Sequence, residues 1–297
     1  MLSRRTALLA PLAAAATPSF AAAGKMSLCL HQNTSLAAGY RKSLEGWARA
    51  GIKNVELTDR MLDDFLKTDT LSAARSLVKD LGLTVVSCAA VQPDLWIPGA
   101  TRMPSLETWK QKCEQFASFG VERIYCPAVT TRKVTPEDYK GAPDCIREAA
   151  EAARQNRLTA MIEFTRTSTF IATLTTSLKL LREAAHPNAR PMLDCYHFWS
   201  GLGKLEDLDL LNPGELAHVH FQDVPDMPRE LLDNTTRIVP GDGVSPLVQI
   251  LRKLAAKNYA GSLSVELFLP EFQQGDPYEV ARRIREKAES VMRKAKV

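Results

Sequence analysis

Short apolar runs alternate with longer segments of helical spacing along most of the chain. Eight runs rich in apolar and β-branched residues are typical of buried strands, and they lie at residues 26–31, 54–57, 84–90, 123–129, 159–164, 190–195, 216–221 and 262–268. Segments with the apolar spacing of helices follow them, at residues 40–50, 71–81, 105–119, 136–155, 168–185, 205–211, 246–257 and 278–294. The alternation predicts a parallel sheet whose strands are joined by right-handed helical crossovers.

The number of repeats decides between a closed and an open sheet. Eight strand–helix units are the number that closes into a barrel. An open doubly wound sheet normally carries a glycine-rich turn after its first strand, whereas residues 32–35 here are Gln-Asn-Thr-Ser. We therefore predict an α/β fold of the (β/α)8 barrel type, formed by residues 24–297 as one domain.

The first residues do not fit this pattern. Arg4 and Arg5 precede an apolar, acid-free stretch that ends in three alanines at residues 21–23. A pair of basic residues, an apolar stretch and small residues at its end are together typical of an export signal. The order of residues resembles a twin-arginine signal, although the usual Phe after the arginines is absent. We expect residues 1–23 to be such a signal and the protein to be periplasmic or secreted.

Charge and cysteine content narrow the classes of partner. The formal net charge is +4, which gives no concentrated basic face for nucleic acid. No segment after the signal is apolar for long enough to span a bilayer. Six cysteines occur without a Cys-x-x-Cys pair, and four lie in strand-like runs, so we expect reduced core thiols. These features favour a small-molecule partner. They leave open whether the protein forms a homo-oligomer.

Four of the predicted strands end in a potential metal ligand. Glu163, Asp194, His220 and Glu266 close the fifth to eighth strands in order. Since the carboxyl ends of barrel strands meet at one mouth, these side chains can converge. Three carboxylates buried together repel one another unless a cation separates them. Oxygen donors with one imidazole suit Mn²⁺, Zn²⁺, Co²⁺ or Mg²⁺, so we predict a site for one divalent cation.

Further polar residues border this mouth in the sequence pattern. His197 could donate to a substrate oxygen or serve an internal hydrogen bond. Arg237 could bind substrate hydroxyls or brace the long loop that contains it. Glu56 and His31, near the ends of the second and first strands, are further candidates for substrate contact.

Other residues near the mouth have two readings each. His218 should lie inside the barrel below the cation, and Asp223 should cap its loop or orient a ligand. A sugar ring could pack on Trp96, Trp199 or Phe268, although such aromatic residues also serve plain packing.

The order of these motifs resembles that of the xylose isomerase-like TIM barrels, and in particular their inosose isomerase branch. The resemblance covers residues 26–295 and rests on Ile162-Glu163, Leu193-Asp194-x-x-His197, His218-Val-His220-x-x-Asp223, Arg237-x-x-Pro-Gly-x-Gly243 and Ser264-Val-Glu266. It implies that the four ligands named above hold one divalent ion and that His197 contacts the substrate. It also implies an isomerase or epimerase of a keto-sugar or keto-inositol. Because nothing in the sequence resembles a phosphate-binding glycine loop, we expect the substrate to be unphosphorylated. A divalent cation would stabilise an enediolate, and Glu163 and Glu266, on opposite sides of it, would be the proton carriers.

Two positions depart from the ketohexose epimerases of this group, which carry a second Glu and an Arg where this chain has Thr169 and Asp226. The substrate can therefore differ from theirs. A lyase or dehydratase acting on a 3-keto sugar or polyol is the main alternative, since an enolate with a β leaving group eliminates. A non-catalytic sugar-binding barrel is another. A repair nuclease is disfavoured, because residues 84–90 supply no histidine.

Overall fold

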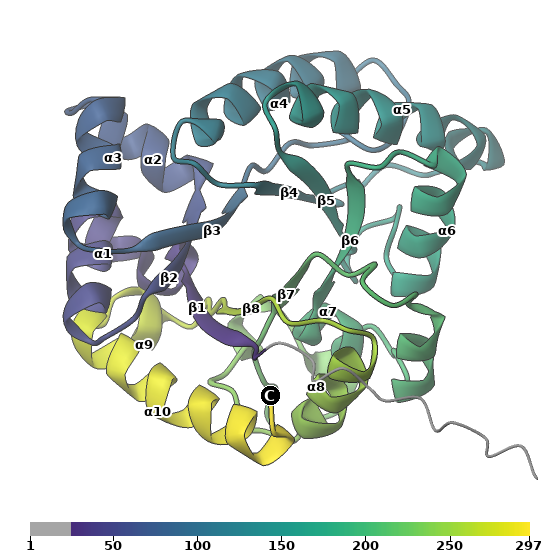
Figure 1. The fold of residues 1–297 in the computed structure, drawn as a ribbon. Coiled ribbons are helices and arrows are strands. Elements are labelled where there is room, and N and C mark those ends of the chain that lie inside the picture. The colour runs from purple at the N-terminus through teal and green to yellow at the C-terminus, as the bar shows by residue number, and fades with distance from the viewer. Residues whose placement is uncertain (1–24) are drawn as a thin grey trace, which may run out of the picture.

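Eight parallel strands form a closed barrel in the computed structural model, which describes residues 25–297. Figure 1 shows these strands as a ring enclosed by helices. The strands are β1 (Ser27–His31), β2 (Asn54–Thr58), β3 (Thr84–Ala89), β4 (Arg123–Pro127), β5 (Thr159–Glu163), β6 (Ala189–Asp194), β7 (His218–His220) and β8 (Ser262–Val265). The predicted (β/α)8 fold is confirmed, and β1 closes the ring by pairing with β8. The predicted export signal lies outside the described residues.

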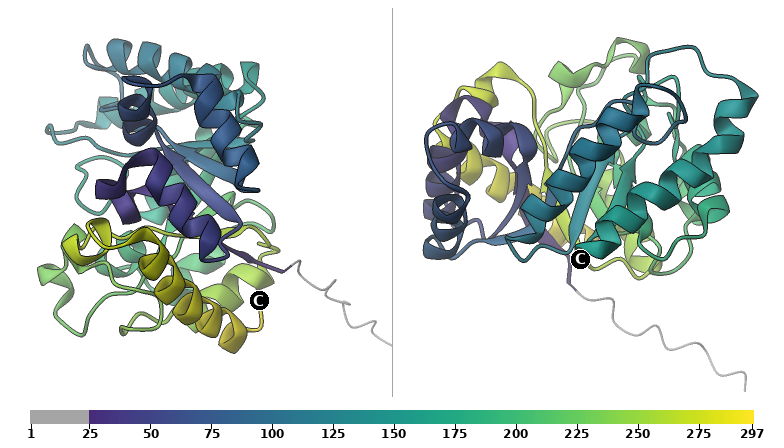
Figure 2. Two further views of the ribbon diagram at one scale, coloured as in Figure 1. Left: turned by 90° about the vertical axis from the view of Figure 1, so that its left-hand side faces the viewer. Right: turned by 90° about the horizontal axis from the view of Figure 1, so that it is seen from above.

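The helices form the outer layer of the barrel, and Figure 2 shows them from the side and from above. They are α1 (Gly39–Arg49), α2 (Asp59–Leu66), α3 (Leu71–Asp80), α4 (Arg102–Ala117), α5 (Pro136–Gln155), α6 (Leu174–Ala184), α7 (Cys195–Ser200), α8 (Leu247–Ala256), α9 (Pro270–Gln273) and α10 (Pro277–Ala295). Short 3-10 turns are η1 (Gln32–Ala38), η2 (Leu205–Leu210), η3 (Arg229–Leu231) and η4 (Asn234–Thr236).

Two helices that periodicity did not indicate begin directly at strand ends. The last residue of β2, Thr58, accepts a hydrogen bond from the amide of Met61 and so starts α2. Asp194 ends β6 and accepts from the amide of His197, which starts α7. Such N-cap side chains accept hydrogen bonds from backbone amides that have no partner in the first turn of a helix. Both helices are too short to show a clear apolar period, and they bring their first residues close to the barrel mouth.

Apolar side chains fill the inside of the barrel as well as the layer between strands and helices. Ala89, Tyr125, Met161 and Met192 pack together in the barrel interior as a cluster separate from the main core. All six cysteines are buried and unpaired, as the sequence predicted. Among the described residues, no helix combines the length and the apolar character that a bilayer crossing requires.

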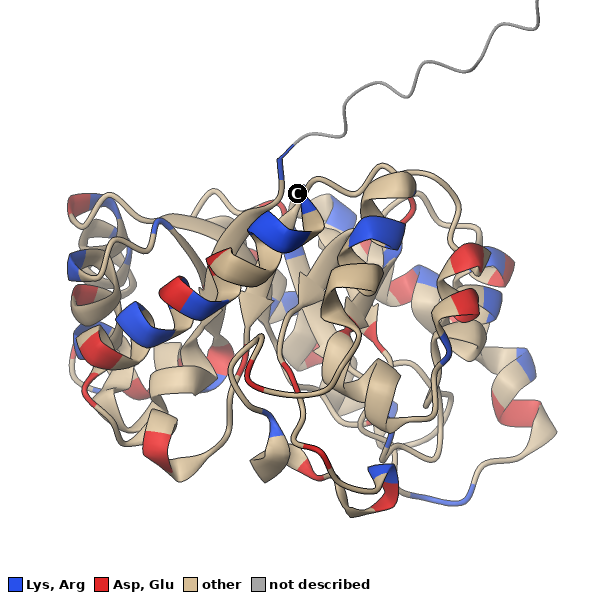
Figure 3. Cartoon of the chain, turned by 90° about the horizontal axis from the view of Figure 1, so that it is seen from below, with Lys and Arg blue, Asp and Glu red and all other residues tan. Residues whose placement is uncertain are grey.

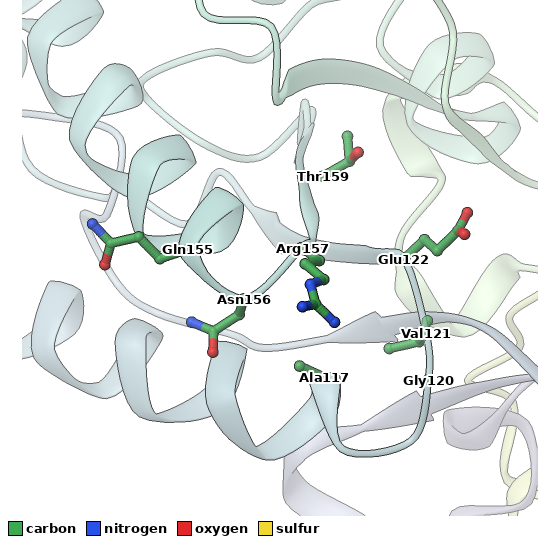
Figure 4. Close-up of a pocket in the computed structure, with 8 residues that line it drawn as sticks. All are labelled: Ala117, Gly120, Val121, Glu122, Gln155, Asn156, Arg157 and Thr159. Carbon is green, nitrogen blue, oxygen red and sulfur yellow. The ribbon is translucent and has the colours of Figure 1, made fainter.

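Within residues 25–297, both groups of potential metal ligands contain His220, at the carboxyl end of β7, and neither lies at the amino end of the barrel. Basic and acidic residues alternate over the outer helices (Figure 3). A groove of about 630 Å³ lies where the loops before β4 and β5 meet (Figure 4). Its charged side chains are Glu122 and Arg157, and it contains none of the residues predicted for the site. The candidate site therefore lies at the carboxyl ends of the strands.

Candidate active site

The carboxyl ends of β5 to β8 bring four potential ligands together. Glu163, Asp194 and His220 are the last residues of their strands, and Glu266 directly follows β8. One ligand atom from each lies within 4.8 Å of the other three, and all four residues are buried. Because neighbouring barrel strands place their ends at one mouth, the regular fold is sufficient to explain this convergence.

The ligand atoms of this cluster that lack hydrogen-bond partners are arranged as a divalent cation would require. His220 Nδ1 lies 3.0 Å from Glu163 Oε1, 3.4 Å from Asp194 Oδ2 and 3.5 Å from Glu266 Oε2. His220 Nδ1 and Glu163 Oε1 are nevertheless buried without a hydrogen-bond partner. Buried polar atoms without partners are costly. One imidazole nitrogen among three carboxylates is a donor set that suits a divalent metal ion.

Glu56 holds the His220 ring from below. Its Oε2 lies 3.2 Å from His220 Nε2 and 3.1 Å from His218 Nε2. A proton on His220 Nε2 directed at this carboxylate leaves Nδ1 as the acceptor that faces the cluster, which is how carboxylates commonly fix a ligand histidine. Glu56 is fully buried, and its carboxylate is engaged by the two histidines. The structure thus places it beneath the ligand cluster, its contact with substrate stays a prediction, and His218 has the expected position inside the barrel.

The carboxylates also determine the charge of the ring. Burial alone would lower the pKa of His220, but Glu56, Glu163 and Glu266 together raise the pKa well above its ordinary value. Without a cation the ring therefore favours its doubly protonated form. A metal ion at Nδ1 would replace that proton, as it does for histidine ligands in general.

Arg237 occupies one side of the cluster. Its Nη1 donates to Asp194 Oδ2 at 2.8 Å and to Glu266 Oε2 at 2.7 Å. The guanidinium lies between the rings of Tyr196 and Phe268, with its central carbon 4.6 and 4.9 Å from the two ring centres. Without a cation, Arg237 shares the balance of charge with the protonated His220 ring. Once that proton is replaced, one guanidinium cannot balance three carboxylates, and a divalent cation would neutralise the excess of negative charge.

His197 lines the cavity next to Arg237. Its Nε2 accepts a hydrogen bond from Arg237 Nη2 at 3.0 Å, and its backbone amide donates to Asp194 at 2.6 Å. Burial lowers the pKa of His197 to about 4, and the charge of Arg237 adds to that effect, while Asp194 opposes it. The imidazole is therefore neutral at physiological pH. The structure places it at the cavity wall, and its contact with substrate stays a prediction.

A cavity of about 750 Å³ opens above the cluster. Glu163, His197, Arg237 and Glu266 line it, as does the expected aromatic residue Phe268. The rest of its wall combines apolar side chains with polar ones, and the polar ones include Asn33, Thr58, Tyr125, Thr165, Thr167, Asn234 and Gln273. A cavity of this size with convergent polar groups is typical of a small-molecule site.

Three other residues that the sequence analysis named as possible substrate contacts lie away from the cavity surface. His31 is fully buried and lies beneath the cavity wall, with Nε2 3.0 Å from the Tyr125 hydroxyl, so it does not face substrate directly. Trp96 is 2% exposed and donates to the carbonyl of Cys126, so it belongs to the core. Trp199 packs under the guanidinium of Arg229, at 3.6 Å from the ring centre, and does not line the cavity.

Three functional candidates were missed by reasoning from strand ends alone. Gln222 donates to Asp194 Oδ2 at 2.7 Å, and Asn33 donates to Glu266 Oε1 at 3.0 Å. Tyr125 lines the cavity from β4. Gln222 lies two residues after His220, and side chains at that spacing in an extended segment point to the same side. The sequence could therefore have identified Gln222 as a neighbour of the ligand cluster. Nothing in the local sequence marked Tyr125 as different from a core residue.

Comparisons with known proteins agree with this geometry. The sequence profile of the xylose isomerase-like TIM barrel family matches residues 44–294. An inosose isomerase of Halalkalibacterium halodurans is 26% identical over 259 residues, which are 84% of this chain and 90% of that enzyme. A 3-dehydroshikimate dehydratase of Pseudomonas aeruginosa is 27% identical over 80% of this chain but only 38% of its own length. The crystal structure of the IolI protein with a bound zinc atom superposes with a TM-score of 0.82 at 21% identity and covers 91% of this chain and 99% of that one.

Proposed function

The chain belongs to the xylose isomerase-like TIM barrel family, and from that premise we propose that it is a divalent-metal-dependent isomerase or epimerase of an unphosphorylated keto-sugar or keto-inositol. The observation that carries the proposal is the buried set of Glu163, Asp194, His220 and Glu266 at the floor of a polar cavity. Four inosose isomerases are among the relatives, and three of them are matched over 90% or more of their length.

The cation has a defined place in this proposal. Glu163, Asp194, His220 and Glu266 would hold it, and Glu56 would fix the tautomer of His220. When bound, a divalent cation supplies a Lewis acid that stabilises negative charge on neighbouring oxygens of a substrate. The zinc atom in the IolI structure supports a divalent ion of this class. Mn²⁺, Zn²⁺, Co²⁺ and Mg²⁺ all suit the donor set.

The two glutamates are the proposed proton carriers. They come from β5 and from the end of β8, and both face the cavity. One takes the proton from the carbon between a carbonyl and a hydroxyl group, and the other returns a proton. Return to the same carbon from the other face gives epimerisation, whereas return to the former carbonyl carbon gives isomerisation.

The protonation of the two glutamates differs in the cation-free protein. Burial raises the pKa of Glu163 to about 7. Burial also raises the pKa of Glu266, but His31 and Arg237 outweigh it and lower the value. Two carboxyl groups with separated pKa values are the usual basis for dividing acid and base roles.

Charge in the cavity favours a neutral polyol over a carboxylated substrate. The only buried cation on the wall is Arg237, and Asp194 and Glu266 already neutralise it. Arg60, the other cation on the wall, is exposed at the rim. A substrate carboxylate would therefore meet an excess of negative charge. The remaining wall offers amides and hydroxyls, which match the hydroxyl groups of a sugar or inositol.

A dehydratase on the same cation site is the second candidate, and the match to the 3-dehydroshikimate dehydratase supports it. Metal analysis of the purified protein, followed by incubation of the loaded protein with unphosphorylated inososes and ketohexoses, separates the two. The proposal expects an isomer of unchanged mass. A product lighter by one water would favour the dehydratase. Absence of any product, with inosose binding unchanged in Glu266→Gln, would favour a sugar-binding barrel.

A further inference from the structure

Tyr125 stands out because nothing in the proposed chemistry uses it. It lies in the middle of β4 and is 2% exposed, and its ring packs among Ala89, Met161 and Met192 in the barrel interior. Its edge-on neighbour is the His220 ring, with ring centres 5.1 Å apart. The residue nevertheless lines the cavity. A tyrosine in this position brings a hydroxyl group to the floor of an otherwise acidic site.

The hydrogen bonds of His31 determine which way this hydroxyl can donate. His31 Nδ1 lies 3.2 Å from the backbone amide of Asn33, and that amide can only donate. Nδ1 must therefore be the ring's acceptor. Glu266 Oε1 lies farther from the same nitrogen, at 3.5 Å, and no hydrogen bond joins the two; this oxygen accepts from the side-chain amide of Asn33 at 3.0 Å. The proton of the neutral ring consequently lies on Nε2.

The donor at His31 Nε2 faces Tyr125, at 3.0 Å from its oxygen. The tyrosine oxygen thus acts as the acceptor, and its own proton must be directed elsewhere. Within residues 25–297 the hydroxyl has no hydrogen bond other than the one with His31. A buried donor without an acceptor is costly, and Tyr125 lines the cavity, where a substrate could supply that acceptor.

We propose that Tyr125 is a substrate-binding residue whose hydroxyl, oriented by the chain from Asn33 through His31, donates a hydrogen bond to an oxygen of the bound substrate. The inference rests on the proposed function for the identity of that substrate, a keto-polyol. It does not require a proton to leave Tyr125. The hydroxyl would add a donor beside a set of carboxylates that can only accept when ionised, and it would hold a hydroxyl or carbonyl oxygen against the cation side of the cavity.

The first experiment compares Tyr125→Phe with the wild-type protein, both loaded with Mn²⁺. The substitution keeps the ring and removes only the hydroxyl. Hydrogen bonds to oxygens that gain negative charge are the stronger kind, so we expect kcat/KM on the inosose that the wild type converts best to fall about 10- to 100-fold. The dissociation constant for Mn²⁺, measured by electron paramagnetic resonance, should change less than about twofold, because Tyr125 is not among the ligands.

Tyr40→Phe is the matched control. Tyr40 is also buried, and its hydroxyl donates to the carbonyl of Ala74, away from the cavity. This variant should melt at a lower temperature and keep its kcat/KM. Unchanged kcat/KM in Tyr125→Phe would overturn the proposal. So would an equal loss of kcat/KM and of Mn²⁺ affinity, because that pattern would mean that Tyr125 acts only through His31 and Glu266.

The second experiment does not depend on turnover. Long-range proton–nitrogen correlation spectra of protein labelled with ¹⁵N-histidine report which ring nitrogen of His31 carries the proton, and His31→Asn identifies the signal. We expect protonation at Nε2. Protonation at Nδ1 would mean that Tyr125 donates to His31 and has no free proton, which would overturn the proposal. Failure of the wild type to convert any keto-polyol, with the expected tautomer intact, would instead count against the proposed function alone.

Discussion

The three buried carboxylates of the site respond differently to their surroundings. Asp194 has a pKa held well below its usual range, because Arg237 and His197 outweigh the effect of burial. The pKa of Glu266 is also lowered. Glu163 receives no hydrogen bond from Arg237 and, through burial, has its pKa raised to about 7. The position of one guanidinium therefore separates a permanently ionised pair of ligands from a carboxyl group that can exchange a proton near neutral pH.

Replacing Arg237 with Gln should lower the free energy of unfolding, because it removes the positive charge beside Asp194 and Glu266. Asp194 and Glu266 would remain as buried charges without their cationic partner, and breaking such a pair costs about 3 kcal/mol or more. We expect a decrease of this size in the free energy of unfolding, measured by urea denaturation of the metal-free protein in EDTA. With saturating Mn²⁺ the loss should be smaller, because the metal ion supplies part of the missing charge.

The matched control for this experiment is Arg132→Gln. Arg132 pairs with Asp138 at a partly exposed position. Pairs of that kind contribute about 1 kcal/mol or less, and Mn²⁺ should not alter that loss. An Arg237→Gln variant equally destabilised with and without Mn²⁺ would contradict the charge balance described for the site.

His197 predicts how stability changes with pH. Its pKa is lowered to about 4 by burial first and by Arg237 second, whereas in the unfolded chain it has the ordinary value near 6.5. Above about pH 6.5 both states are neutral and the group contributes nothing. As the pH falls from about 6.5 to about 4, only the unfolded state gains a proton, so the folded state loses up to roughly 3 kcal/mol.

The measurement is chemical unfolding of the wild type and of His197→Asn at several pH values in EDTA. The difference between the two free energies should narrow as the pH falls through this window, because the variant lacks the titrating ring. A difference that stays constant from pH 7 to pH 4.5 would show that the ring is not kept neutral by its surroundings.

Among the elements, the segment between β7 and α8 (residues 221–246) brings Arg237 to the site. Asp223 anchors it: one carboxylate oxygen accepts from the amides of Val224 and Ser245, and the other accepts from those of Gly241 and Gly243. Asp223 and Ile238 also form a single antiparallel bridge. The expectation that Asp223 caps its loop is thus confirmed. A side chain at Gly243 would meet the carbonyl oxygen of Val224 at 2.0 Å, so the turn requires glycine there.

Replacing Asp223 with Asn should loosen this segment. The new NH₂ group would face backbone donors in place of an acceptor, and buried donors without partners cost about 2 to 4 kcal/mol in total. We expect a corresponding loss in unfolding free energy together with a fall in kcat/KM, since Arg237 loses its fixed position. Asp242→Asn, whose carboxylate pairs with Arg283 and Lys287 on the surface, should leave both nearly unchanged. Equal effects of the two variants would argue against the anchor.

The sequence indicated the strands and their polar ends well but not the short elements. Strand periodicity and the chemistry of Glu163, Asp194 and His220 are local signals, and a closed barrel then forces convergence. Glu56 could not be placed correctly, because its partners His218 and His220 lie more than 160 residues away and face it only across the closed barrel. Tyr125 differs from a core residue only through its contact with His31, which no local pattern reveals.

At the scale of the whole molecule, the closed ring of strands supports one mouth where charge is concentrated. The outer helices carry mixed charge and the amino end carries an open groove without a ligand cluster. The mouth combines a buried ligand set, a neutral imidazole and a cavity of about 750 Å³ lined by both polar and apolar groups. This arrangement is what metal-assisted proton transfer on a small polyol requires, and the remaining fold serves to hold it rigid.

The most direct test of this account is uptake of deuterium from D₂O at the carbon next to the carbonyl of an inosose, followed by nuclear magnetic resonance. We predict uptake by the Mn²⁺-loaded wild type and a decrease of at least about 100-fold in Glu163→Gln, in Glu266→Gln and after removal of the metal with EDTA. Uptake at the wild-type rate in either variant, or in the metal-free protein, would contradict the claim that these two glutamates move the proton beside a bound cation.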